Sequence, residues 1–93
     1  MKRVLILPSF ERSLKKLISQ DRRKLSHSLE TFNSFLLFGD APQGLGFKKI
    51  NHDKYEFRVD IRLRVIVKAE NDDYCLVLVG NHNEVRRYLR NFR

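Results

Sequence analysis

The spacing of apolar residues changes once along this chain, and that change limits the folds open to it. Over residues 10–36 the apolar positions recur every three or four residues, as on the buried side of an amphipathic helix. From Lys48 onward they recur every second residue, as in half-buried strands. Residues 40–47 lie between, contain one proline and two glycines, and predict a loop. A helical half followed by a strand half predicts an α+β domain.

The helical half follows a short strand. Residues 3–7 form a β-branched and aliphatic run that ends at Pro8, and they predict a first strand. Ser9 and Asp21 are the expected N-caps of two successive helices. Gly39 stands where the second helix needs a left-handed C-terminal residue. Two helices joined this tightly predict a hairpin.

The second half predicts a sheet meander and a last helix. Strands are expected at 55–59, 63–68 and 75–79, with turns near Ile61 and Arg62 and at 71–73. The continuously apolar run 75–79 indicates a strand buried on both faces. Residues 84–92 predict a short C-terminal helix. The expected fold is a single α+β domain over 1–93, namely a strand, a helical hairpin, an antiparallel meander and a terminal helix, with the helices against one sheet face.

Composition narrows the choice of partners. A chain of 93 residues has room for one two-layer core and for a shallow site, which disfavours chemistry with a large cofactor. The net charge of +8 favours an anionic partner, most often nucleic acid. Residues 1–45 and 46–93 each carry +4, so any basic patch must be assembled by folding.

The cysteine and histidine content argues against disulfides and metal sites. The only cysteine, Cys75, rules out an internal disulfide and a cysteine-based zinc site, and its apolar neighbours indicate a buried position. The three histidines have no metal-ligand spacing, so no metal is expected. No signal-peptide core or membrane span is recognisable, which predicts a cytoplasmic protein.

Strand alternation places cations together. If the apolar residues of 55–59 face the helices, Arg58 projects from the other face, beside Arg64 and Lys68 of the next strand. Neighbouring like charges favour a bound anion. The alternative is a set of solvated exterior residues, some of them paired with the acidic side chains Glu56, Asp60 and Glu70.

His82 is a second candidate for chemistry. It follows the buried strand directly, and the end of a core strand is a rigid mount beside an exposed loop. A histidine there can exchange protons near neutral pH, or it can be an ordinary polar turn residue. His27 and His52 fit surface positions.

Taken together, the segments 48–50, 55–59, 63–67 and 78–85 resemble the RelE/ParE toxin superfamily, whose members are small basic proteins with this order of elements. The resemblance implies a metal-independent endoribonuclease, an mRNA interferase that in many members acts in the ribosomal A site. The 2′-hydroxyl of the RNA attacks the adjacent phosphate. Protein groups remove its proton, stabilise the phosphorane and protonate the 5′-oxygen.

The resemblance also implies roles for individual residues. His82 is the expected general acid or base, Arg64 the phosphate stabiliser, and Arg58 a second group on the same phosphate. The residues expected to hold RNA are Lys48, Lys49, Lys68 and Arg86.

Two positions depart from RelE itself. Glu56 stands in place of a lysine, and Arg86 stands in place of a functional tyrosine. Tyr88 lies about 200° around the helix axis from residue 86 and cannot substitute for that tyrosine.

Other functions on the same fold stay open. The protein could instead be a ParE-like inhibitor of DNA gyrase with no nuclease activity. The presence of Arg64 and His82 argues against this alternative. A degenerate toxin would be an interaction module. The resemblance to the RelE/ParE superfamily implies a cognate antitoxin, whose acidic segment would cover the basic face. It implies no cofactor.

Overall fold

The chain forms a five-stranded sheet with helices on both sides. The computed structural model describes residues 3–39 and 44–91. The elements in chain order are β1 (Arg3–Ile6), α1 (Pro8–Lys15), α2 (Ser19–Phe38), β2 (Lys48–Lys49), β3 (Lys54–Arg58), β4 (Leu63–Glu70), β5 (Asp73–Asn81) and α3 (His82–Asn91). The predicted α+β class and element order are confirmed. Phe92, where the last helix was expected to end, lies outside the described residues, as do residues 40–43 of the predicted loop.

The starts of the two N-terminal helices differ from the prediction. Helix α1 has Leu7 as its N-cap and Pro8 in its first turn, where a missing N–H costs nothing. The Ser9 hydroxyl instead donates to the carbonyl of Val77 in β5, 2.7 Å away. Helix α2 begins at Ser19, so the prediction that Ser9 and Asp21 are N-caps is wrong.

The end of α2 is as predicted. Gly39 adopts a left-handed conformation with φ of 81°, and its N–H donates to the carbonyl of Phe35. A residue without a Cβ adopts this conformation without strain.

The sheet has the strand order β1-β5-β4-β3-β2. Strands β2 to β5 form the expected antiparallel meander, and β1 pairs with β5 in parallel. The two predicted turns lie between β3 and β4 and between β4 and β5, the second with Asn71 at a φ of 55°. A register shift at Ile66 and Val67 gives β5 one extra residue opposite them.

The main core lies between the sheet and the first two helices. Phe10, Leu25, Phe32 and Phe57 are fully buried there, and the rings of Phe32 and Phe57 stack with centroids 4.6 Å apart. Burying each of these aromatic side chains contributes about 1.5–3 kcal/mol relative to exposure. This layer holds the sheet rigid and leaves its other face for different contacts.

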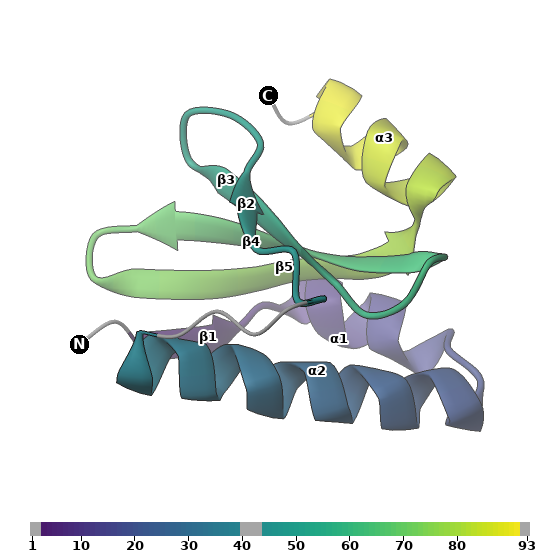
Figure 1. Cartoon of the computed structure of the whole chain (residues 1–93). Coiled ribbons are helices and arrows are strands. Elements are labelled where there is room, and N and C mark those ends of the chain that lie inside the picture. Colours follow the sequence, from purple (N-terminus) through teal and green to yellow (C-terminus); the bar gives the residue numbers. More distant parts are fainter. Residues whose placement is uncertain (1–2, 40–43, 92–93) are drawn as a thin grey trace.

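The C-terminal helix packs on that other face. Figure 1 shows α3 across the sheet from α1 and α2. Val85 of α3 is buried against Ile66 of β4 and Val77 of β5. The expectation that all helices lie against one face is therefore wrong, because β5 runs directly into α3 and turns it over the open face.

The structure also places the single cysteine and allows the helices to be compared with membrane spans. Cys75 is a buried free thiol, and burial raises its pKa. Within residues 3–39 and 44–91, no helix has both the length and the apolar character needed to cross a membrane.

Candidate active-site groove

His82 is held at the junction of β5 and α3. Asn81 and Glu84 form a reciprocal cap, in which the Asn81 N–H donates to Glu84 Oε1 and the Glu84 N–H donates to Asn81 Oδ1, both at 2.9 Å. Gly80 permits this approach, since a Cβ there would lie 3.0 Å from the Cβ of Glu84. His82 is thus the first residue of α3, on a fixed backbone at the end of a core strand.

A groove of about 400 Å³ lies between α3 and the strands. It is lined by basic, acidic and apolar side chains from β2, β3, β4 and α3: Lys48, Lys49, Ile50, Glu56, Arg64, His82, Val85, Arg86 and Leu89. His82 and Arg64, predicted to act together, therefore face one groove. Lys48, Lys49 and Arg86, predicted to hold RNA, line it too.

Glu56 lies within this groove and was not among the predicted catalytic residues. Its side chain is only 9% exposed. Its Oε1 lies 3.3 Å from Lys48 Nζ and 3.6 Å from Arg64 Nη1. Lys48 and Arg64, the arginine expected to bind phosphate, thus both contact the Glu56 carboxylate, a group that can accept a proton. Strand pairing explains the arrangement, because Lys48 lies opposite Glu56 across β2 and β3.

Arg58 and Lys68 do not line the groove. Arg58 is the cross-strand partner of Arg64, but it lines a separate depression with His27 and Thr31 of α2, so the prediction that it shares the open face of the sheet with Arg64 is wrong. Lys68 lies further along β4, where its Nζ is 3.6 Å from Glu70 Oε2. The ion pairs of Lys68 and of Arg64 match the alternative in which strand cations are paired with acidic neighbours. Arg64, however, is paired with Glu56 and also lines the groove.

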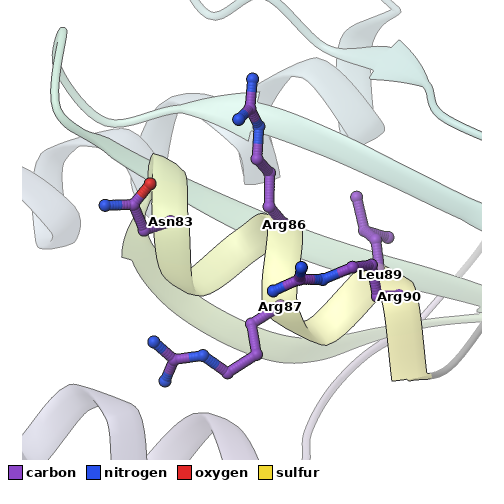
Figure 2. Close-up of a pocket in the computed structure, with 5 residues that line it drawn as sticks. All are labelled: Asn83, Arg86, Arg87, Leu89 and Arg90. Atoms are coloured by element: carbon purple, nitrogen blue, oxygen red, sulfur yellow. The ribbon is translucent and has the colours of Figure 1, made fainter.

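Helix α3 carries further arginines beside the groove. Arg86, Arg87 and Arg90, with Asn83 and Leu89, line a depression of about 720 Å³. Figure 2 shows Arg86 and Arg87 pointing away from each other on successive positions of the helix. Among the described residues, none of the three arginines takes part in an ion pair. Because Arg86 lines both hollows, the positive surface is continuous from the groove onto α3.

Tyr88 lies on the side of α3 that packs against the sheet. It is half-buried beside Ile66 and Val77 and does not line the groove. Burial raises the pKa of its phenol, with Lys68 opposing the shift and Asp53 adding to it. This position agrees with the expectation that Tyr88 cannot substitute for an aromatic residue at position 86.

Comparison with known proteins gives no sequence match. No family model matches this chain, and no curated protein sequence does either. Solved structures do match it. A chain of the RelB–RelE antitoxin–toxin complex from Methanococcus jannaschii has a TM-score of 0.67 at 19% identity, over 90% of this chain and 96% of that one.

This chain has a RelE-like fold. A chain of the DinJ–YafQ complex from Escherichia coli has a TM-score of 0.68 at 14% identity, over 91% of this chain and 98% of that one. A copper-bound mutant toxin from Helicobacter pylori has a TM-score of 0.67 at 15% identity, over 91% and 99%. One fold supports several functions, so the function of this RelE-like chain depends on the residues of its own groove.

Proposed function

We propose that this RelE-like protein is a toxin that cleaves cytoplasmic mRNA, and that the groove between α3 and the sheet is its active site. The observation that carries the proposal is that Glu56, Arg64 and His82 line one groove together with two lysines. A carboxylate, an arginine and a histidine can supply the base, the charge stabiliser and the acid that cleavage of RNA by its own 2′-hydroxyl needs.

Each group has a role in a balanced reaction. Glu56 accepts the proton of the 2′-hydroxyl, and that oxygen forms a bond to the adjacent phosphorus. Arg64 donates hydrogen bonds to the phosphorane oxygens, where negative charge gathers. His82 gives a proton to the 5′-oxygen as its bond to phosphorus breaks. The products are a 2′,3′-cyclic phosphate and a free 5′-hydroxyl.

The remaining groove residues bind the strand. Lys48, Lys49 and Arg86 are exposed cations on the groove walls and attract the phosphates on either side of the cut. Ile50 and Leu89 give the same walls apolar surface, against which an unstacked base can pack. Arg58 and Lys68 lie outside the groove, so no contact with the scissile phosphate is assigned to them.

An antitoxin is the proposed protein partner. The similar structures from M. jannaschii and E. coli are toxin–antitoxin complexes. In this chain the arginines of α3 and the lysines of β2 form an exposed positive surface around the groove. An acidic antitoxin segment that covers this surface would block the groove and neutralise its charge.

The test is cleavage of a reporter mRNA by purified protein, with and without ribosomes. We expect His82→Ala and Arg64→Ala each to lower the cleavage rate by about a hundredfold or more. The matched controls are His27→Ala and Arg23→Ala, which change exposed side chains of α2, and they should cleave at the normal rate.

Two outcomes would contradict the proposal. If both groove variants keep full cleavage, the active site is elsewhere. If the wild type leaves mRNA intact but inhibits supercoiling by gyrase, the protein is an inhibitor of the ParE kind.

A further inference from the structure

A further depression meets the active-site groove at His82. It has a volume of about 360 Å³ and is lined by Ile61, Arg62, Asn81, His82 and Asn83. His82 lines both this depression and the groove. In Figure 1 the turn between β3 and β4 lies at the same end of the sheet as the start of α3. A strand that is cut beside His82 therefore has a hollow on each side of the cut.

The turn that forms one wall is held rigidly. Asp60 Oδ1 accepts hydrogen bonds from the backbone N–H groups of Arg62 and Leu63, both at 2.8 Å. The Arg62 guanidinium donates to Asp21 Oδ1 of α2, 3.1 Å away. Lys24, also from α2, lies 3.2 Å from Asp60 Oδ2. These contacts fix the turn on both sides of Ile61 and tie it to the helix layer.

Ile61 itself is the most exposed large apolar side chain among the described residues, at 89%. A single exposed isoleucine is ordinary on a protein surface, so its exposure alone indicates nothing. This isoleucine differs because it stands on an anchored turn and lines the depression that meets His82. Its position is fixed without being buried, as suits a contact surface for a ligand.

We propose that this depression binds the nucleotide that follows the scissile phosphate, with its base packed against Ile61. The inference rests on the proposed function. His82 protonates the leaving 5′-oxygen, which belongs to that nucleotide, whereas Glu56 acts in the groove on the nucleotide before the cut. A strand that leaves the groove past His82 enters this depression, because His82 lines both hollows.

The chemistry of the walls fits an RNA base. Aliphatic side chains pack against unstacked bases in other nucleic-acid complexes. Asn83 offers an amide that both donates and accepts, and it can bind the edge of a base held there. The volume is near the lower end of ligand pockets, about 300 Å³, and so suits one nucleotide better than a helix of a protein partner.

The experiment combines Ile61→Ala with an abasic site in the RNA. Short synthetic mRNAs carry either a normal nucleotide or an abasic one directly after the cut, and ribosomes are present if the wild type requires them. We expect Ile61→Ala to lower kcat/KM about fivefold on the normal RNA, near the low end for side chains that stack on bases. On the abasic RNA, the variant and the wild type should cleave equally fast.

The matched control is Ile18→Ala, which shortens an isoleucine that is 63% exposed at the start of α2 and should change neither rate. Equal losses on both RNAs, or no loss on either, would overturn the subsite. Weaker binding of the antitoxin with unchanged cleavage would assign Ile61 to a protein contact instead. A wild type that cleaves neither RNA would overturn the proposed function and the subsite with it, which distinguishes that result from failure of the subsite alone.

Discussion

At the scale of single residues, Glu56 changes the chemistry that the groove supports. A buried carboxylate among cations is a poor choice for binding RNA, because it repels phosphate. A carboxylate can instead act as a general base, provided that its neighbours hold it in place. Lys48 and Arg64 do so, and both contact the same carboxylate oxygen. Glu56, which stands in place of the lysine of RelE, is therefore a candidate functional group of this chain.

Glu56→Gln tests that role. The amide keeps the shape and a hydrogen-bond acceptor for Lys48 and Arg64 but is not a base at neutral pH. We expect kcat to fall by about a hundredfold or more while the KM for RNA is unchanged or lower, since one negative charge is removed from the groove. Thermal unfolding of both proteins serves as the control for stability. A variant that cleaves at the wild-type rate would show that Glu56 is only a structural ion-pair partner.

Sequence alone could place some of these residues but not all. Alternation along β4 correctly predicted that Arg64 lies on the face away from α1 and α2. The end of the apolar run correctly predicted that His82 directly follows a core strand. The place of Glu56 in the groove was missed because it depends on α3 covering the same face of the sheet. Arg58 ends β3, where strand twist and the neighbouring helix α2 decide which hollow it lines.

At the scale of elements, polar side chains serve contacts between elements more than the helix ends that local patterns predict. Ser9 binds the β5 backbone, and Asp21 binds Arg62 of the β3–β4 turn. Cap preferences describe an isolated helix, and tertiary partners override them. The cap of α3 is local, with Asn81 and Glu84 three residues apart, and it could have been read from the sequence as a capping box.

The anchored β3–β4 turn predicts a dependence of stability on pH. Burial alone would raise the pKa of Asp60, but hydrogen bonds from the Arg62 and Leu63 backbone and from Lys24 lower it overall. With its folded pKa below the unfolded value, Asp60 contributes stability above about pH 3.9 and loses it as the pH falls through the folded pKa. Asp60→Asn should therefore lower the free energy of unfolding by about 1 kcal/mol at pH 7 and flatten its decline in acid.

Urea unfolding at a series of pH values measures this effect. Asp72→Asn, at the exposed turn between β4 and β5, is the matched control and should follow the wild-type curve. If Asp60→Asn declines in acid as steeply as the wild type, the carboxylate contributes nothing as an ion.

At the scale of the whole molecule, folding gathers onto one side of the sheet basic residues that are evenly spread along the sequence. Each half of the sequence carries +4, yet the groove and the outer side of α3 place Arg64, Arg86, Arg87 and Arg90 on one side of the sheet. No local pattern predicts this, because it depends on α3 lying over the sheet face opposite the other helices. A surface of this kind binds a polyanion largely through release of counterions, and its affinity depends steeply on salt.

The salt dependence of RNA binding measures how many of these charges meet phosphate. Binding of a 2′-O-methyl RNA, which lacks the attacking hydroxyl, is followed over a range of salt concentrations. Each phosphate contact to single-stranded nucleic acid contributes a slope of about −0.7 to log K against log salt. If Arg87 and Arg90 each bind one phosphate, Arg87→Ala/Arg90→Ala should make the slope shallower by about 1.4. Arg12→Ala/Arg23→Ala removes the same charge from α1 and α2 on the far side and should leave the slope unchanged. Equal slopes in all three proteins would mean that RNA does not reach α3, and that its arginines serve another anionic partner such as the acidic antitoxin.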